Sequence, residues 1–353
     1  MARPTLASLA HELGVSRQTV SNVLNAPERV KPATRERVAA AIEAAGYRPS
    51  AAARQLRTRR SMNLGMRLRP ATDGINGSIL DRFLHAVTEA AQAVGYRLTL
   101  FCADTDEDEI RQFERLLPVA GLDGFILTDS SRGDVRTRWL QEQGTPFAVF
   151  GRPWDDEDAS PADHPWVDID GAAGTAAAVA MLVAQGHTRI GFLGGAGSGP
   201  MGEDRRAGWE RGMRESGLAH LVAELSAVAP DTIPGGIAGG RQLVAKGATA
   251  LVCSSDALGI GALDILREAR PGLVLPGEHN LRAAAVGFDN TPVAAALGLS
   301  SVDQPVEDAA RHLIRLLTHD LAGQLDSAAP PENHLLLTPR VVERVPLPVS
   351  GPR

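Results

Sequence analysis

The sequence predicts an α/β protein with a small all-α domain at the N-terminus and a larger domain of alternating strands and helices after it. Three observations support this division. Residues 1–46 show helical periodicity with capping residues, short apolar strands alternate with helices from residue 62 onward, and basic charge is concentrated in the first domain. A chain of 353 residues is long enough for a small domain and a two-lobed larger one.

The first two predicted helices form a helix-turn-helix. Thr5 can cap a helix whose apolar residues recur at three- and four-residue steps as far as Leu13. Gly14 supplies the turn, and Ser16 caps a second helix over residues 17–24. The outward polar residues of this second helix are Arg17, Gln18, Ser21 and Asn22. A short helix with polar side chains at its exposed N-terminal end suits insertion into the DNA major groove.

A third helix begins at Pro32 and ends before Gly46, and the segment 51–57 follows as a short run of good helix formers among arginines. These first sixty residues resemble the LacI/GalR (lactose-repressor) family. The resemblance is carried by TLASLAHELGVSRQTVSNVLN (5–25), GYRP (46–49) and ARQL (53–56). It implies a DNA-binding domain over residues 1–49 and a hinge helix over 50–60, whose Leu56 wedges between base pairs from the minor groove.

Arg17, Gln18 and Asn22 are the predicted base-contacting residues, with a solvated helix surface as the alternative. Asn22 departs from the arginine that is frequent at this position of the family, and asparagine pairs with adenine where arginine pairs with guanine. Several hydroxyl and amide residues could serve phosphates or helix caps, and the sequence leaves both roles open. The predicted DNA-contacting residues are Thr5, Ser16, Arg17, Gln18, Thr19, Ser21, Asn22, Asn25, Thr34, Tyr47, Ala53, Arg54 and Leu56.

The distribution of charge supports the assignment of DNA binding to the N-terminal domain. Residues 1–61 contain 11 arginines and lysines against 4 glutamates, which gives a net charge of +7. The remaining residues have a net charge of −13, so the whole chain has a net charge of −6. A basic domain suits contact with phosphates, and an acidic body repels DNA elsewhere. Cys102 and Cys253 lie in apolar strand-like runs, so we expect buried, reduced thiols. The absence of an apolar signal region or membrane-length segment predicts a soluble cytoplasmic protein.

After residue 61 the sequence alternates between short apolar, strand-like runs and segments with helical periodicity. The predicted strands are 62–68, 96–102, 124–128, 147–150, 189–193, 250–253 and 284–287, and the predicted helices are 79–94, 109–119, 135–143, 174–185, 205–216 and 257–269. Short apolar strands separated by helices predict parallel, doubly wound sheets. One sheet would be overloaded, so we expect two lobes with a cleft between them.

Several sequence segments in this larger domain also resemble the regulatory domain of the same family. They are GLDGFIL (121–127), FGRP (150–153), VDIDGAAG (167–174), LVAQGHTRIGFLGG (182–195), RRAGW (205–209), ALVCSSDALGIGAL (250–263), VGFDN (286–290) and SSVDQP (300–305). The resemblance implies an effector-binding and dimerisation domain over 61–346, folded like a periplasmic sugar-binding protein with three crossings between lobes. The expected N-lobe is 61–160 plus 291–322, and the expected C-lobe is 163–288 plus 326–346.

Arg205 and Asp289 are the main predicted effector residues. Each follows a strand end, where open α/β sheets bind ligands, and their family matches hydrogen-bond the ligand. An arginine and a carboxylate together suit the hydroxyl pairs of a sugar, whereas a surface salt bridge or a cap is the structural alternative. The further predicted effector residues are Asn76, Ser78, Thr128, Asp129, Arg152, Ser255, Asp256 and Gln304. Trp154 and Trp166 could stack on a sugar or simply pack.

No cofactor or metal site is predicted. Residues 197–202 fit the pattern G-x-G-x-x-G, but a proline interrupts them, and we do not expect the segment to run straight from a strand into a helix. The acidic run 104–109 is explained by the favourable effect of acidic residues at a helix start.

The sequence thus predicts a homodimeric, effector-responsive transcription factor, a repressor that binds a near-palindromic DNA operator. A sugar is the expected effector, with a purine or another small molecule as the alternative. The C-terminal VVERVPLPVSGPR contains prolines that preclude a leucine-heptad coiled coil, which favours a dimer over a tetramer. A sugar-binding transport protein and an enzyme are the rival classes. The N-terminal module argues against the first, and the second lacks a catalytic constellation.

Overall fold

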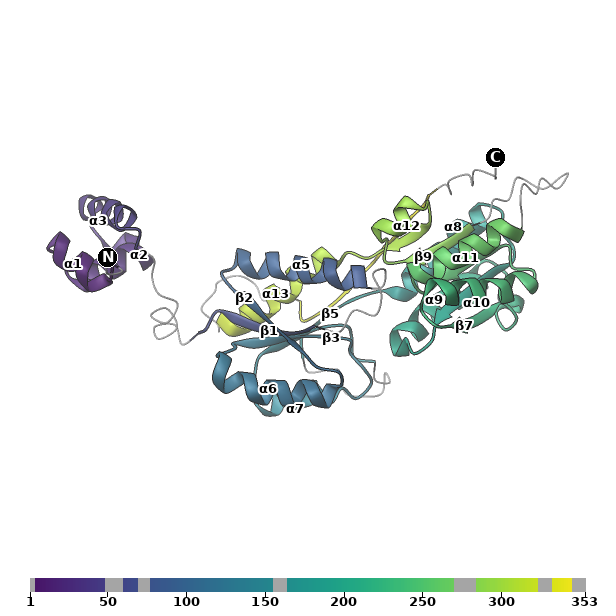
Figure 1. The fold of residues 1–353 in the computed structure, drawn as a ribbon, viewed down its shortest axis with the longest axis horizontal. Coiled ribbons are helices and arrows are strands. Elements are labelled where there is room, and N and C mark those ends of the chain that lie inside the picture. Colours follow the sequence, from purple (N-terminus) through teal and green to yellow (C-terminus); the bar gives the residue numbers. More distant parts are fainter. Residues whose placement is uncertain are drawn as a thin grey trace. The chain divides into compact units, whose positions relative to one another are not determined.

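The computed structural model describes residues 4–47, 60–68, 77–154, 164–269, 284–322 and 332–344 (Figure 1). The chain divides into two compact units, Met1–Ser61 and Met62–Arg353. The hinge segment predicted over residues 50–60, including Ala53, Arg54 and Leu56, lies outside the described residues except for Arg60.

The first unit is helical, as predicted. Its elements are α1 (Leu6–Leu13), α2 (Arg17–Asn25), the short 3-10 helix η1 (Pro27–Arg29) and α3 (Pro32–Ala44). Leu9, Ala10, Val20 and Val38 form its buried core, and the partly buried side chains packed around them include Tyr47. Helices as short as α1 and α2 are marginal alone, so this shared core stabilises them.

The second unit contains two six-stranded sheets. The first sheet is parallel throughout and has the order β11-β5-β4-β3-β1-β2. Its strands are β1 (Asn63–Leu68), β2 (Arg97–Cys102), β3 (Gly124–Thr128), β4 (Phe147–Phe150), β5 (Trp166–Ile169) and β11 (His334–Leu337).

Helices cover both faces of this first sheet (Figure 1). Along β3, Ile126 packs with α5 and α13 on one face, whereas Phe125 and Leu127 pack with α6 and α7 on the other. The alternation follows from the two-residue period of a strand and explains why β3 is buried throughout. The helices are α5 (Gly77–Ala93), α6 (Asp106–Ala120), α7 (Val135–Glu142) and α13 (Val306–Ala322). The acidic run predicted to start a helix does so, in the first turn of α6.

The second sheet has the order β12-β10-β9-β8-β6-β7, and only the edge strand β12 is antiparallel. Its strands are β6 (Ile190–Gly195), β7 (Ser226–Ala229), β8 (Ala250–Cys253), β9 (Ala284–Phe288), β10 (Ser300–Asp303) and β12 (Arg340–Val342). Its helices are α8 (Gly171–Ala184), α9 (Gly199–Glu215), η2 (Ala219–Leu221), α10 (Ile233–Ala245), α11 (Asp256–Ala269) and α12 (Pro292–Ala296). The two-lobed, doubly wound architecture is therefore confirmed.

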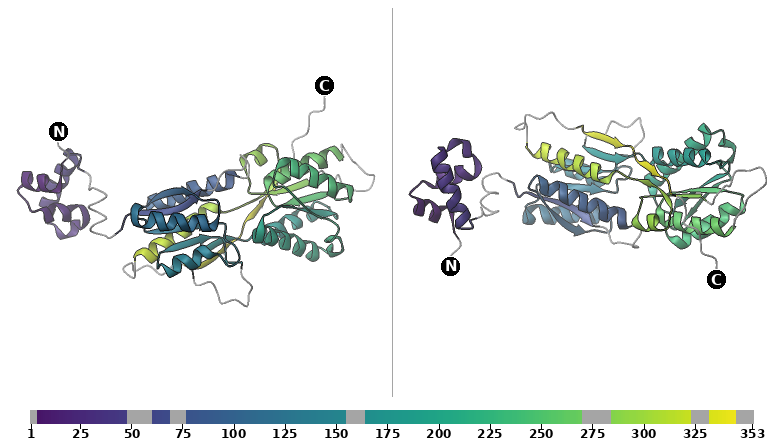
Figure 2. Two further views of the ribbon diagram at one scale, coloured as in Figure 1. Left: turned by 60° about the horizontal axis from the view of Figure 1, so that its bottom comes forward. Right: turned by 90° about the horizontal axis from the view of Figure 1, so that it is seen from above.

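The chain crosses between the lobes three times, as expected, but at other places. It crosses after β5, after β10 and between β11 and β12. Residues 166–169 and 334–337 therefore belong to the first lobe and residues 300–303 to the second, so the predicted lobe boundaries are wrong for these three segments. Strand pairing decides this: β5 hydrogen-bonds with β4, and β10 with β9. One result is that α13 lies beside α5, far from it in the sequence (Figure 2).

Several short elements were not predicted, and α10 is the most instructive. Its sequence IPGGIAGGRQLVA contains four glycines, which weaken any helix prediction. A Cβ atom on Gly236 would lie 2.3 Å from the carbonyl oxygen of Leu258 in α11, and one on Gly261 of α11 would lie 2.3 Å from the carbonyl oxygen of Ile233. The glycines therefore permit α10 and α11 to pack backbone against backbone.

The prediction for the cysteines is half correct. Cys253 is fully buried in β8, and burial raises the pKa of its thiol. Cys102 is exposed at the end of the edge strand β2.

Candidate functional site

Local hydrogen bonds set the geometry of the helix-turn-helix. The Thr5 hydroxyl accepts a bond from the Ser8 amide at 3.1 Å, and the Ser16 hydroxyl accepts one from the Thr19 amide at 3.0 Å. Gly14 has a φ of +61°, in the left-handed region that glycine adopts without strain. Thr5 and Ser16 therefore act as helix caps in this structure, one of the two roles the sequence leaves open.

Polar side chains line the outer face of α2. Arg17 and Gln18 are exposed, and Ser21 and Asn22 are half-buried. The Gln18 Nε2 atom donates a 2.8 Å hydrogen bond to the Asn22 Oδ1 atom, so these two amides are held together across one turn. The bond does not use the Gln18 Oε1 acceptor or the Asn22 Nδ2 donors.

The other described residues predicted to contact DNA lie on α2, on α3 and after α3. The Thr19 hydroxyl is 2.9 Å from that of Ser16. Thr34 lies in the first turn of α3, and Tyr47 packs against the core of the unit. Asn25 ends α2. No contact with DNA is tested by these placements, so the base-contacting roles stay predictions.

A cavity of about 490 Å³ opens at the carboxyl ends of the strands in the second unit, where both lobes contribute side chains. This is the size of a site for a small organic ligand. We call it the cleft cavity. Of the predicted effector residues, the structure brings six together on its wall: Thr128, Asp129, Arg205, Ser255, Asp289 and Gln304.

Arg205 supplies a half-buried cation to the cleft cavity. Its Nη1 atom donates a 2.6 Å hydrogen bond to the Ser254 carbonyl oxygen, and its guanidinium carbon lies 3.8 Å from the centre of the Phe288 ring. Its Nε atom is buried and has no hydrogen-bond partner among the described residues. Burial lowers the pKa of this guanidinium, but arginine stays charged at any physiological pH. A ligand hydroxyl can satisfy the unpaired donor.

Asp289 supplies the matching carboxylate. Burial raises its pKa to about 7, although the positive charge of Arg205 opposes the shift. Its Oδ1 atom accepts a 2.6 Å hydrogen bond from the Gln304 Nε2 atom. The backbone of Asp289 has a φ of +110°, which a residue with a Cβ atom adopts only under strain. Strain of this kind, held by the surrounding structure, is typical of ligand-binding positions.

Three carboxylates on the wall were missed at the sequence level: Asp168, Asp204 and Asp231. Arg152, a predicted effector residue, does not line the cleft cavity but lies 3.2 Å from Asp168 and 2.8 Å from Asp204. Because Asp204 belongs to α9, this contact joins the two lobes. Burial raises the pKa of Asp168 to about 6 and also raises that of Asp204. Asp168 lies within the unpredicted strand β5 and Asp231 follows the unpredicted β7, so only their polar character beside apolar residues could have marked them.

Besides Arg152, two described effector candidates, Asp256 and Ser78, do not line the cleft cavity. Asp256 is completely buried, and its two carboxylate oxygens accept hydrogen bonds from the Thr291 amide and the Ser301 hydroxyl at 2.7 and 2.6 Å. This aspartate therefore braces the loop after β9, and its assignment to the effector was wrong. Ser78 lines a neighbouring cavity, and Asn76 lies outside the described residues. Trp154 lines the cleft cavity, whereas Trp166 stacks on His334 at 5.2 Å.

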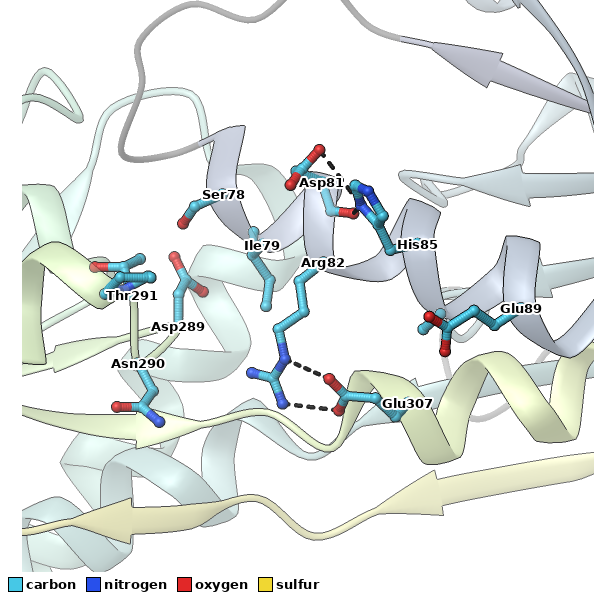
Figure 3. A pocket seen from close by; sticks show the side chains of 12 residues that line it. Ser78, Ile79, Asp81, Arg82, His85, Glu89, Asp289, Asn290, Thr291 and Glu307 are labelled. Atoms are coloured by element: carbon cyan, nitrogen blue, oxygen red, sulfur yellow. Dashed lines mark hydrogen bonds and ion pairs between the residues drawn. The ribbon is translucent and has the colours of Figure 1, made fainter.

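The neighbouring cavity has about 500 Å³ and lies between α5, the loop after β9 and the start of α13 (Figure 3). Arg82 points across it toward Glu307, to which it donates two hydrogen bonds of 2.6 and 2.8 Å, and it also bonds to Asp303. Asp289 lines both cavities. Arg82 is already paired here, so this second cavity has less capacity for a ligand.

The glycine-rich segment 197–202 requires a correction. Only Ala196, Gly197 and Ser198 separate the end of β6 from the start of α9, so the segment does lie between a strand and a helix, contrary to the expectation. It borders the cleft cavity. Pro200 occupies the first turn of α9, where a proline costs no hydrogen bond.

Neither a metal cluster nor a membrane-spanning helix is found in the described parts of the chain. No group of three or more histidine, cysteine and acidic side chains there could hold a metal ion. No helix among the described residues combines the length and the apolar character needed to cross a bilayer.

Comparison with known proteins matches both units. Residues 5–50 match the bacterial regulatory proteins of the lacI family, and residues 179–345 match a periplasmic binding protein-like domain. The transcriptional regulator CelR of Thermobifida fusca is 32% identical over 333 residues, which cover 91% of this chain and 93% of the relative.

Solved structures agree with this. A regulatory protein of the LacI family from Chloroflexus aggregans is 31% identical with a TM-score of 0.69, covering 80% of this chain and 97% of that one. CelR in complex with cellobiose is 27% identical with a TM-score of 0.66, covering 97% of this chain and 99% of that one.

Proposed function

This chain belongs to the LacI family of bacterial transcriptional regulators, and we propose that it is a repressor whose affinity for an operator is controlled by a sugar in the cleft cavity. The curated relatives are regulators and not enzymes, and the chain is itself a transcriptional regulator. What remains to be proposed is the effector, the sign of regulation and the residues that carry each step.

The observation that carries the proposal is the presence of both the half-buried Arg205 and the buried Asp289 on the wall of the cleft cavity. The guanidinium has an unpaired donor, and the carboxylate has an acceptor beyond the one that Gln304 occupies. Adjacent hydroxyls on a sugar ring can accept from the first group and donate to the second. The relative CelR has been solved with cellobiose, which supports a sugar as the effector here.

The operator contacts are assigned to α2. We propose that Arg17, Gln18 and Asn22 contact base edges in the major groove, and that Thr34 and Tyr47 contact the backbone. A homodimer would place two such helices on a near-palindromic operator. The hinge residues Ala53, Arg54 and Leu56 complete this proposal from the sequence resemblance alone.

A two-part experiment tests the function. Thermal shift with a panel of sugars, headed by cellobiose, and a parallel panel of purines and nucleosides identifies the ligand. Fluorescence anisotropy on an operator selected from random DNA then measures whether that ligand changes operator affinity. A sugar that stabilises the protein and weakens operator binding supports a repressor released by inducer. A response to purines alone would replace the sugar, and a ligand without effect on operator binding would contradict control of the operator.

A further inference from the structure

We infer that the sugar bound in the cleft cavity carries no anionic group, and that a protonated amine on it strengthens binding. This inference rests on the proposed function and adds the charge class of the ligand. It comes from the balance of charged side chains around the cleft cavity.

Carboxylates outnumber cations on this wall. The lining residues include five aspartates, Asp129, Asp168, Asp204, Asp231 and Asp289, and one arginine, Arg205. Two further arginines reach these aspartates from outside the lining: Arg152 pairs with Asp168 and Asp204, and Arg67 lies 3.9 Å from Asp129. Among the described residues that line the cavity, five carboxylates therefore stand against one guanidinium, and Arg152 and Arg67 contact three of the carboxylates from outside.

Most of the hydrogen-bonding groups that the wall leaves for a ligand are acceptors. The Ser255 hydroxyl already donates to Asp231, the Ser130 hydroxyl donates to the Arg152 carbonyl oxygen, and the Gln304 amide donates to Asp289. Ionised carboxylates accept only, so they need donors from the ligand. Sugar hydroxyls and an ammonium group supply donors, whereas a phosphate or an ionised carboxylate supplies none.

The N-terminus of α9 is one feature of the wall that favours an anionic ligand. The start of α9 borders the cleft cavity at Gly197, Ser198 and Met201, and a helix N-terminus acts as about half a positive charge. Asp204 is the sixth residue of the same helix, and Asp231 lies beside Gly195, where β6 ends shortly before that helix begins. Arg152 offsets the charge of Asp204, but the full negative charge of Asp231 is still larger than the half charge of the helix start.

Burial gives the excess charge its effect. Asp168 has a pKa raised to about 6 and Asp289 one raised to about 7, because burial penalises their ionised forms. A cation placed among them relieves part of this penalty, and an anion adds to it. In a site screened from bulk water the difference is larger than at an exposed surface.

Matched ligands test the inference. One set is glucose, glucosamine and glucose 6-phosphate. The other is cellobiose, its β-1,4-linked glucosamine analogue and cellobiouronic acid. Calorimetric titration of the full-length protein near neutral pH should give the order amine, neutral sugar, anion within each set that binds. We expect at least about a tenfold loss of affinity for the anion, and an advantage of the amine that shrinks as salt is added.

Asp231→Asn provides the matching variant, because it removes one charge and keeps the shape of the side chain. The ratio of amine affinity to anion affinity should fall by about tenfold in this variant. Asp264→Asn is the control, since Asp264 is an exposed residue of α11 outside the cleft cavity, and its ratio should equal that of the wild type.

The two proposals fail separately. An anionic sugar that binds more tightly than its neutral parent overturns the inference on charge and leaves the sugar effector standing. If the ratio of amine affinity to anion affinity is the same in Asp231→Asn as in the wild type, the carboxylates of the wall do not set the charge preference. If no sugar of any charge binds while a purine does, the proposed effector is wrong and the inference falls with it.

Discussion

Arg205 and Asp289 lie where burial makes each charge depend on a partner. Arg205 is held by the Ser254 carbonyl oxygen and the Phe288 ring, and Asp289 by Gln304. Neither set of contacts uses the full hydrogen-bonding capacity of the side chain. A buried polar group without a partner is costly, so a ligand that completes these bonds gains the difference.

Arg205→Ala should therefore cost about 2–5 kcal/mol of effector affinity, by analogy with truncation of one partner in a buried charged pair. Calorimetric titration with the identified effector measures this loss. Arg206→Ala is the matched control, since Arg206 is the next residue of α9 and forms an exposed ion pair with Glu210. An equal loss in both variants would mean that the cleft cavity is not the effector site.

Effector binding should also depend on pH through Asp289, whose pKa of about 7 reflects burial against the opposing charge of Arg205 and the like charges of Asp256 and Asp231. A sugar hydroxyl donates to the ionised carboxylate, so affinity should fall by up to about tenfold per pH unit below 7. Titrations between pH 6 and 8 should show this slope in the wild type and in Asp264→Asn. Asp289→Asn should bind more weakly and without the slope.

The stability of the ligand-free protein should change with pH in the opposite direction. The ordinary pKa of an aspartate is about 3.9, so between about pH 4 and 7 the unfolded chain loses this proton while folded Asp289 keeps it. The contribution of Asp289 to stability is therefore present below pH 4 and is lost as the pH rises through 7. A wild type and an Asp289→Asn variant with the same pH dependence of unfolding would contradict the raised pKa.

At the scale of the element, α2 presents two amides that act together. The hydrogen bond from Gln18 to Asn22 orients both groups before any DNA is present. Asn22→Arg breaks this pair and replaces an adenine-reading side chain with a guanine-reading one. We expect selection from random DNA to return guanine at one symmetric position, with a preference of about 1–3 kcal/mol per contact. An unchanged operator motif would exclude Asn22 as a base-contacting residue.

The pairing of α10 with α11 depends on glycines at the contact. In Gly261→Ala the new Cβ atom would lie 2.3 Å from the Ile233 carbonyl oxygen, and backbone atoms cannot move aside as a flexible side chain can. We expect a loss of about 1–3 kcal/mol of stability by chemical denaturation. Gly240→Ala is the graded comparison, because its nearest atom is 3.2 Å away and its loss should be smaller. Equal losses would point to helix propensity rather than to this contact.

At the scale of the whole molecule, side chains from both lobes meet at the cleft cavity and across it. Arg152 of the first lobe pairs with Asp204 of the second, and Arg132 donates a 2.6 Å bond to Glu203 of α9. A ligand in the cleft cavity therefore contacts two bodies that three chain segments connect. Control of the operator requires that the ligand bind two states of this assembly with different affinity.

Arg205→Ala should lock the regulator in the state that the free protein prefers, because the ligand can no longer shift the equilibrium. Operator affinity without effector should stay as in the wild type, since α2 belongs to the separate first unit. A reporter gene under the operator would then be permanently repressed if the effector is an inducer, and permanently expressed if it is a corepressor. A normal response of the reporter at the wild-type effector concentration would contradict the coupling.

The sequence by itself determined the helix-turn-helix, the two-lobed fold and the positions of Arg205 and Asp289. The fold depends on local signals, namely caps at Thr5 and Ser16 and apolar periodicity, and Asp289 directly follows the buried strand β9. Arg205 is the seventh residue of α9, so the family resemblance and not a strand end marked it. Such local signals depend on residues close together in the sequence, so they can be recognised before the fold is known.

Only the tertiary structure decided which lobe each short strand joins, why α10 is a helix and which aspartates reach the cleft cavity. Asp256 and Asp231 each come shortly after a strand, yet the first accepts hydrogen bonds from Thr291 and Ser301 while the second lines the wall. Strand partners, a backbone-to-backbone helix contact and the direction of a carboxylate all depend on residues distant in the sequence. Their energies come from pairs that form only when the chain is folded, so no local pattern can encode them.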